Sequence, residues 1–352
     1  MKLRTALVSV LAIALFAWFL SHADMAAVWR HVRTARIEML VVAFVFVFVT
    51  YWTRAIRWQH LLAPVGKTRF RTAFRTTVIG FAALGLLPAR AGDLLRPYLL
   101  ARQEGLSPTA TFATVIMERV LDLVAVLALL AVFVWGFADA HTLPANLLGP
   151  ITVSASIAAA AAAALLILMW VLASHPERIA RLVLAAGRVL PSRVAERLAD
   201  FARVFSSGFA AARHPRSVLL ATLWSFPIWL AIAIEAWAVT IGFGIDMPFS
   251  GTFLLQALLV IGVAVPTPGA VGSYHEAYRF GVTTFFGAEN DQAVAAAIVL
   301  HAISFVPVSL LGILYMAQDG LSIGRLTTMT GEAREKEMPH TDEVPILRPS
   351  RR

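Results

Sequence analysis

The chain has no cysteine and few charged residues: Asp, Glu, Lys and Arg make up 14% of its 352 residues. The absence of thiols excludes disulfide bonds and thiolate metal sites. About a quarter of the residues in a typical soluble domain are charged, whereas here 59% of the residues are hydrophobic. This composition predicts an all-α polytopic membrane protein.

The motifs of soluble catalytic modules are also missing. The sequence holds no P-loop, G-x-S-x-G, H-E-x-x-H or dinucleotide fingerprint in a suitable context. No stretch outside the hydrophobic segments is long enough to fold a substantial core. We therefore expect no soluble catalytic domain, no catalytic residues, no cofactor and no metal site.

Six hydrophobic segments are long enough to cross a bilayer, which takes roughly 20 residues. We expect the first to remain as an uncleaved anchor, although Lys2, Arg4 and the small residues that follow it also fit a signal peptide. The six segments are Leu3–Leu20, Met39–Leu62, Ala110–Phe137, Leu147–Ala173, Val218–Ile241 and Ala293–Ala317.

Two further apolar stretches break on Pro and Gly: Pro88–Arg96 reads PARAGDLLR, and Pro268–Glu276 reads PGAVGSYHE. The apolar residues before each break, Thr76–Leu87 and Gly251–Val265, are too short for a span. Non-helical backbone at membrane depth needs protein or a wet cavity around it. We therefore predict two re-entrant hairpins, with two kinked spans as the alternative.

Loop charges orient the chain, because Lys and Arg concentrate on the cytoplasmic side. The stretch Ser174–Arg216 holds eight arginines against three acids. No Lys or Arg occurs in the loops 138–146, 242–250 and 287–292. This pattern predicts a multi-pass protein of the cell (inner) membrane with both termini in the cytoplasm. It also accounts for the net charge of +9, so no nucleic-acid partner is expected. Three arginines fall outside against this rule, in a segment expected to form an amphipathic helix on the outer surface: Arg30, Arg33 and Arg36.

The order span, hairpin, span occurs twice, in the units 39–137 and 218–317. Three crossings separate the starts of the two units, so we predict an inverted repeat. Aligning the two breaks pairs Pro88 with Pro268, Gly92 with Gly272 and Arg96 with Glu276.

We assign residues 1–320 to one transmembrane domain with a cytoplasmic amphipathic linker at 174–216. Within this linker, Leu182–Phe205 spaces apolar residues three or four apart, with arginines between them and a break at Pro191. Such helices bind anionic lipid, here at the cytoplasmic face. The tail, 321–352, is polar and is expected to be disordered.

Charged side chains inside a membrane helix are costly, at ~2.5–3.5 kcal/mol each at the bilayer centre. The run ERVLD places Glu118, Arg119 and Asp122 inside an apolar helix. Glu118 and Asp122 share a face, and Arg119 can reach Asp122. Two interpretations remain open: an ion-pair lock that holds the first hairpin, and a direct role in binding substrate or a proton.

The first hairpin carries Arg90, Asp93 and Arg96 around its break. Arginine forks and a helix N-terminus suit a phosphate, so we predict that Arg90 and Arg96 hold the phosphate of a lipid headgroup. Asp93 also fits a simple helix cap, and the arginines also fit snorkelling to the cytoplasmic interface.

The second hairpin carries His275 and Glu276, and two spans carry Glu235 and His301. An intramembrane carboxylate is a functional candidate, so Glu276 predicts a site for a cationic headgroup moiety or a proton, with His301 facing it. A hydrogen-bonded structural histidine is the simpler reading of His301. Glu235 is either a proton group or a local ion-pair partner.

Two arginines lie between two tryptophans near the end of the second span: Trp52, Arg54, Arg57 and Trp58. This pattern is typical of an aromatic and basic belt at the cytoplasmic interface.

Four motifs in order resemble the flippase-like membrane domain of lysylphosphatidylglycerol synthase: RAIRWQHLL at Arg54–Leu62, LPARAGDLLRP at Leu87–Pro97, ERVLD, and PTPGAVGSYHEA at Pro266–Ala277. The resemblance covers roughly Leu3–Ala317. It implies a role in moving a lipid, such as an aminoacylated phosphatidylglycerol, from the inner to the outer leaflet. The synthase's aminoacyl-transfer domain has no counterpart here, so no synthesis of lysyl-lipid is expected. Members often carry Asn shortly before the first Pro, where this chain has Leu84.

These observations together predict a flippase or translocase for a membrane phospholipid or lipid-linked substrate. The alternatives are an intramembrane enzyme acting on a lipid-linked phosphate or sugar, with Glu118, Asp122 and His301 as acid and base, and a non-transporting partner in envelope lipid or glycan synthesis.

Overall fold

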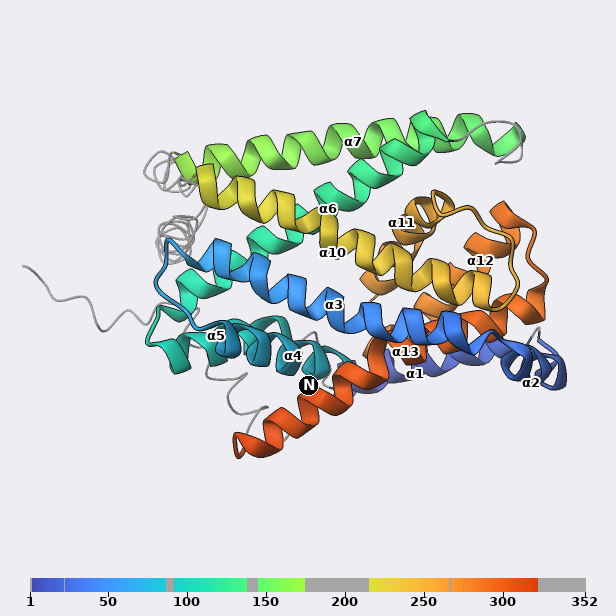
Figure 1. Ribbon diagram of the computed structural model, residues 1–352, viewed down its shortest axis with the longest axis horizontal. Helices are drawn as coiled ribbons and strands as arrows, with labels where there is room; N and C mark the ends of the chain where they lie inside the picture. Colours follow the sequence, from blue (N-terminus) through green and yellow to red (C-terminus); the bar gives the residue numbers. More distant parts are fainter. Residues whose placement is uncertain are drawn as a thin grey trace, which may run out of the picture.

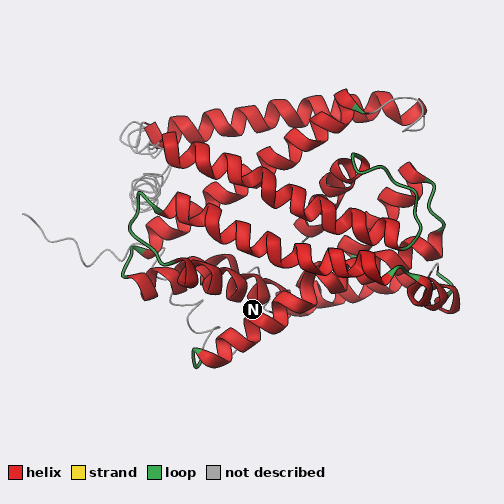
Figure 2. Ribbon diagram, in the orientation of Figure 1, coloured by secondary structure: helices red, strands yellow, loops and turns green. Residues whose placement is uncertain are grey.

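The computed structural model describes residues 2–21, 23–86, 92–137, 145–174, 215–265 and 267–321. Within these ranges every regular element is a helix and no strand occurs, as the composition predicts (Figure 2). The helices are α1 (Lys2–Ser21), α2 (Met25–Thr34), α3 (Ile37–Leu62), α4 (Phe70–Leu86), α5 (Gly92–Glu104), α6 (Pro108–Gly136), α7 (Ala145–Ser174), α10 (Pro215–Gly242), α11 (Gly251–Ala264), the 3-10 turn η4 (Pro268–Ala270), α12 (Ser273–Phe286) and α13 (Asn290–Gln318).

Each of the six predicted spans lies in a helix, namely α1, α3, α6, α7, α10 and α13. Among the described residues, four helices are long and apolar enough to cross a membrane: α3, α7, α10 and α13. Residues 10–21 of α1 and helix α2 add a fifth span if the two, bent by 83°, form one broken span. Helix α6 has 29 residues but carries the three charges of ERVLD in its interior. The chain is thus a polytopic helical membrane protein with four or five apolar candidate spans.

The chain turns back on itself at the first predicted break. Helices α4 and α5 run antiparallel and touch along their backbones, since a Cβ added to Gly92 would lie 2.0 Å from the carbonyl oxygen of Gly80. A Cβ on Gly80 would in turn lie 2.6 Å from that of Arg96. The pair is a helical hairpin and not a kinked span. Its first arm begins at Phe70, earlier than predicted, and residues 87–91 of the break lie outside the described residues.

The second break forms a similar hairpin from α11, η4 and α12. A Cβ on Gly262 of α11 would lie 2.9 Å from that of Ala277 on α12. The turn between the arms is tight, and Gly272 adopts φ 86°, a value that residues with a Cβ rarely reach. A Cβ at Gly272 would also lie 2.6 Å from that of Leu15, so α1 packs directly on this turn.

The two halves of the chain are intertwined. Helices α3 and α10 lie antiparallel along their length (Figure 1), with Gly242 packed on Met39 at one end. Helix α4 of the first hairpin packs on α13, and α11 of the second hairpin packs on α6. The hairpins also touch at their turns, because a Cβ on Gly269 would lie 3.7 Å from the carbonyl oxygen of Gly85.

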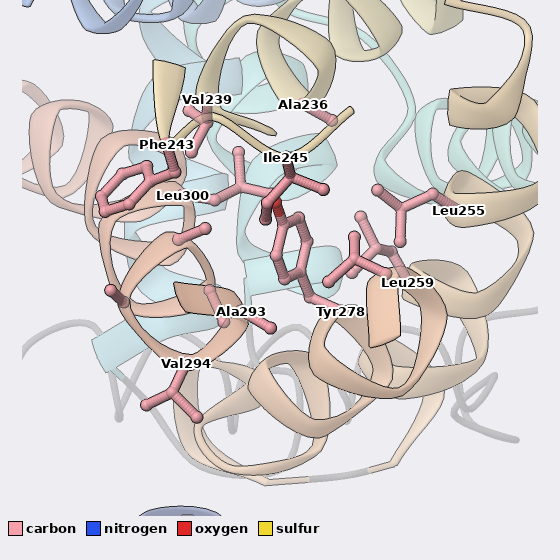
Figure 3. Packing of buried hydrophobic residues seen from close by; sticks show 14 of the residues in the cluster. Ala236, Val239, Phe243, Ile245, Leu255, Leu259, Tyr278, Ala293, Val294 and Leu300 are labelled. Atoms are coloured by element: carbon pink, nitrogen blue, oxygen red, sulfur yellow. The ribbon is translucent and has the colours of Figure 1, made fainter. Parts of the chain in front are cut away.

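Tyr278 lies at the centre of the core of the second half. Figure 3 shows its ring among Leu255 and Leu259 of α11, Val239 of α10 and Leu300 of α13. The ring is fully buried, and the hydroxyl lies 2.8 Å from the Thr240 Oγ1. A buried Tyr hydroxyl usually finds such a partner, and burial of a large apolar side chain stabilises by about 1.5–3 kcal/mol.

The predicted amphipathic segment at Arg30–Arg36 largely forms α2. Asp24 caps this helix by accepting the amide of Ala26 at 2.9 Å. Val28 is buried, whereas Trp29 on the other face is 55% exposed. The predicted helices at 182–205 and the tail after residue 321 lie outside the described residues.

Candidate functional site

Seven charged side chains from α3, α5 and α6 form one ionic cluster beside α10. Three of its members, Arg57, Arg96 and Glu118, are no more than 3% exposed. Charges buried this deeply persist only when they are paired. The ionic cluster consists of Arg54, Arg57, Asp93, Arg96, Glu118, Arg119 and Asp122.

Arg57 lies at the centre of the ionic cluster. Its Nη1 donates to Oδ1 of Asp122 at 2.5 Å and to Oγ of Ser225 at 3.1 Å, and its Nη2 lies 3.4 Å from Oε1 of Glu118. The indole Nε1 of Trp229 also donates to Asp122 Oδ1, at 3.1 Å. Ser225 and Trp229 lie on α10, so the cluster joins the two halves of the chain.

Arg96 ties the first hairpin to α6. Its Nη1 donates to Oε2 of Glu118 at 2.6 Å, and its Nη2 lies 3.4 Å from Oε1 of the same residue. The guanidinium lies over the ring of Trp58, 3.7 Å from its centre. Trp58 is itself anchored by the hydrogen bond from its Nε1 to Oγ1 of Thr114, at 2.9 Å. The cation–π contact and the ion pair together hold Arg96 in one position.

The ionic cluster is accessible at the end formed by Arg119 and Asp93. The side chains of these residues are 38% and 24% exposed, and Arg119 Nη2 donates to Asp93 Oδ1. Arg119 Nη1 lies 3.9 Å from Oδ2 of Asp122, as the spacing in ERVLD predicts. Arg54 lies 3.5 Å from the same oxygen, and both arginines lie over the ring of Phe81.

The ionic cluster carries more positive than negative charge, because four arginines face three carboxylates. The N–H donors of its guanidinium groups also outnumber the acceptor positions of its carboxylates. The buried Nε of Arg57, Arg96 and Arg119 has no hydrogen-bond partner among the described residues. The arrangement therefore suits an additional anion with several oxygen acceptors. General-base chemistry fits less well, since each carboxylate is held by at least one arginine.

A second polar group lies at the turn of the second hairpin. The rings of His275 and His301 lie next to each other, with their centres 4.4 Å apart and their planes tilted by 34°. Glu276 does not face His301, contrary to the prediction: its carboxylate binds Arg279 at 2.6 and 2.8 Å. Glu235 hydrogen-bonds to Ser304 on α13 and so joins α10 to α13.

The predicted site residues therefore divide into two groups. Asp93, Arg96, Glu118, Arg119 and Asp122 lie together in the ionic cluster. The residues predicted in and opposite the second hairpin form separate contacts: His275, Glu276 and His301. Arg90 lies outside the described residues. Arg96 is directed at Glu118, so Arg119 is the arginine of the ionic cluster that a ligand reaches most easily.

Comparison with known protein families assigns most of the chain to one family. A family model of the lysylphosphatidylglycerol synthase transmembrane region matches residues 5–312. The chain belongs to this family. The match covers the ionic cluster and both hairpins, and it confirms the resemblance that the four motifs indicate.

One curated relative is the glycosyltransferase AglD of Haloferax volcanii, which is 26% identical over 293 residues. The alignment covers 76% of this chain and 47% of the relative, so the chain spans about half the length of that protein. The family and this relative together associate the chain with membrane proteins of lipid or glycan synthesis.

The prediction of an interfacial belt at the end of α3 was wrong for three of its residues. Arg57 and Trp58 are fully buried and Arg54 is 8% exposed, while Trp52 is 55% exposed as predicted. The charges of ERVLD could have predicted this burial, because two acids and one arginine need a further cation inside the membrane. Arg54 and Arg57, three residues apart, share a helix face and supply it.

Proposed function

We propose that this member of the family is a transporter that moves a phospholipid or a lipid-linked headgroup between the leaflets of the cell membrane. The ionic cluster carries the proposal, because it is buried, has an excess of arginine and is accessible at Arg119 and Asp93. The phosphate is the part of such a lipid that is most costly to place in hydrocarbon. Arginine forks match its oxygens in geometry and charge.

Binding would begin at Arg119. Asp93 engages Nη2 of this arginine, while Nε on the same edge of the guanidinium is without a partner among the described residues. A phosphate that displaces Asp93 would take both donors in a bidentate contact. Arg57 and Arg96 would stay with their carboxylates and act as positioning residues that hold α6 and the hairpin in place.

An inverted repeat would provide the movement. Exchanging the units 39–137 and 218–317 pairs α3 with α10, α4 with α11, α5 with α12 and α6 with α13. Under this exchange, the contact of α4 with α13 becomes the contact of α11 with α6, and both contacts are present. The antiparallel pair α3–α10 becomes the same pair again. The link Arg54–Asp122 between α3 and α6 matches the link Glu235–Ser304 between α10 and α13. Both features support alternating exposure by rocking of one unit against the other.

The hairpins would enter from opposite faces, the first from the cytoplasm and the second from the exterior, with both termini in the cytoplasm. Their contact at Gly85 and Gly269 supports a meeting of the two turns within the membrane. The headgroup would pass beside these turns while the acyl chains remain in the bilayer.

A leaflet-exchange assay tests the function. The full chain is reconstituted in liposomes that contain fluorescent phosphatidylglycerol, or a fluorescent polyprenyl-phosphate sugar in a parallel series. We expect Arg119→Gln to lower the exchange rate by about tenfold or more, since charge-assisted hydrogen bonds contribute about 1.5–3 kcal/mol. Arg119→Lys, which keeps the charge but loses the fork, is expected to fall in between.

Arg75→Gln is the matched control. Arg75 also pairs with a carboxylate, Asp319 at 2.8 Å, and the two side chains are 16% and 25% exposed. This variant should exchange lipid at the parent rate. Folded Arg119→Gln protein that also exchanges lipid at the parent rate would refute the assignment of the site, and a parent that moves neither probe would refute the function.

A second candidate is an intramembrane enzyme for a lipid-linked phosphate or sugar, which the similarity to a glycosyltransferase favours. The two functions separate in detergent, where no leaflets exist. Mass spectrometry of the lipid probes after incubation with purified protein detects a chemical product only if the chain is an enzyme. Absence of both exchange and product would favour a non-transporting partner in lipid or glycan synthesis.

A further inference from the structure

Two histidines hold the turn of the second hairpin. Gly272 donates its amide N–H to Nδ1 of His275 at 3.3 Å, next to the first turn of α12. His301 on α13 places its Nε2 2.8 Å from the carbonyl oxygen of Gly269. Both bonds go to the backbone at positions of positive φ, 59° at Gly269 and 86° at Gly272. The histidines therefore hold the turn at two glycines whose backbone conformation a residue with a Cβ rarely adopts.

These partners determine which ring nitrogens carry a proton. Nδ1 of His275 accepts a hydrogen bond, so it is unprotonated and the ring is neutral. The carbonyl oxygen of Gly269 only accepts, so Nε2 of His301 must carry a proton. In this pair of neighbouring rings, His275 holds the turn through an acceptor nitrogen and His301 holds it through a donor nitrogen.

The surroundings of His275 offer little to stabilise a cation by charge. The residue is 3% exposed, and α1 faces it with the rings of Phe16 and Phe19, whose centres lie 5.1 and 5.2 Å away. The positive end of α12 also lies beside the ring. Tyr274 of the same helix and the ring of His301 on α13 complete the surroundings.

The nearest acidic side chains are engaged elsewhere. Glu276, next to His275 on α12, binds Arg279, which in turn binds Asn290 at 3.0 Å. Glu235 of α10 binds Ser304, one turn after His301 on α13. Among the described residues, no carboxylate makes a hydrogen bond or ion pair with either histidine ring.

We propose that His275 is the proton-binding site that couples proton uptake to release of the second hairpin's turn, while His301 holds the same turn through Gly269. A proton taken up from water on Nδ1 of His275 removes the acceptor for Gly272 and leaves two donors facing each other. It also creates a cation on a residue that is 3% exposed and has no carboxylate partner among the described residues. The turn then leaves its position, the ring reaches water, and loss of the proton restores the bond. Because the released turn binds the proton better, acid favours release.

This inference rests on the proposed function, in which movement of the hairpins carries the headgroup. It names the proton as the coupling ion. With one proton-binding site, the ratio of molecules with the turn released to molecules with the turn in place can change by at most about tenfold per pH unit.

A spin label on the turn measures release without any transport. The chain has no cysteine, so Val271→Cys gives one labelling position, on a residue that is partly exposed. We record the electron paramagnetic resonance line shape of the labelled full chain in lipid nanodiscs between pH 8 and pH 5. The mobile component should grow as the pH falls, and a line shape that does not respond to pH overturns the proposal.

His275→Asn in the labelled background is the decisive variant. The Asn Oδ1 lies near the position of Nδ1, accepts the Gly272 amide and takes up no proton in this range, so the pH response should disappear. His301→Gln keeps a donor for Gly269, and Glu276→Gln removes the adjacent carboxylate; both should retain the response. A response that survives in His275→Asn overturns the assignment to His275.

Leaflet exchange measured on the same preparations separates the two claims. We expect the parent to exchange lipid at a pH-dependent rate and His275→Asn to lose that dependence. Exchange in the parent that ignores pH, together with an immobile label, overturns the proton site but leaves the transporter. A label that responds to pH in a protein that moves neither lipid probe supports the proton site and refutes the transporter.

Discussion

Glu118→Gln tests the charge balance of the ionic cluster with a change of almost no volume. Glu118 is 2% exposed and lies between Arg96, at 2.6 Å, and Arg57, at 3.4 Å. Glutamine keeps the shape but carries no charge, and its amide group adds a donor among donors. Arg96, 3% exposed, then loses the one carboxylate with which it forms an ion pair among the described residues.

The magnitude follows from the burial of the partners. Breaking a buried ion pair from one side costs about 3–5 kcal/mol, because the remaining charge is uncompensated. Arg96→Gln should cost less, about 1–3 kcal/mol, since Glu118 keeps Arg57 as a partner and the excess of positive charge falls. The double variant Arg96→Gln/Glu118→Gln should cost less than Glu118→Gln alone, because it also removes the uncompensated arginine.

Equilibrium unfolding in mixed micelles with increasing dodecyl sulfate measures these free energies. Tryptophan fluorescence is a suitable signal because Trp58, under Arg96, is fully buried. Uncompensated charge on Arg96 is refuted as the cause if Arg96→Gln destabilises as much as Glu118→Gln, or if the double variant costs the sum of the two single changes.

Three further changes test the packing around the site. Gly92→Ala should prevent the first hairpin from forming, because the new Cβ would lie 2.0 Å from a carbonyl oxygen of the opposite arm. The yield of folded protein in size-exclusion chromatography should therefore fall. Gly85→Ala is the control and should behave like the parent, because its Cβ would lie 3.7 Å from the nearest neighbouring atom. Gly312→Ala should destabilise the contact of α13 with α4, where its Cβ would lie 2.3 Å from another Cβ, and a thermal-unfolding midpoint equal to the parent's would contradict this. Trp58→Phe keeps a ring for the cation but removes the bond to Thr114, so it should cost about 1 kcal/mol in the same micelle titration, whereas Trp58→Leu should cost several times more.

The helices and their breaks follow from local properties of the sequence. Hydrophobic length determines α3, α7, α10 and α13, and the breaks with Pro and Gly follow α4 and α11 after only 17 and 14 helical residues. The contact of Glu118 and Arg119 with the first hairpin was predictable for the same reason: charges at consecutive positions of an apolar helix must find partners nearby.

Long-range contacts were not predictable in this way. The burial of Arg57 depends on how α3 packs against α6 and α10, and nothing in its local sequence separates a buried arginine from an interfacial one. The pair of Glu276 with Arg279, three residues on, is local, but whether Glu276 faces His301 of α13 depends on the rotation of α12 about its own axis. A single sequence gives helix periodicity but not that rotation.

The ionic cluster also imposes an order on biogenesis. The indole partner of Asp122 is made 107 residues after it, and the hydroxyl partner of Arg57 is made 168 residues after it. Until α10 has been synthesised and inserted, α3 and α6 must wait in the bilayer or at the translocon with buried charges only partly satisfied. Quality control in the membrane therefore has a window in which to recognise an unfinished chain, and truncation before α10 leaves this intermediate as the final product.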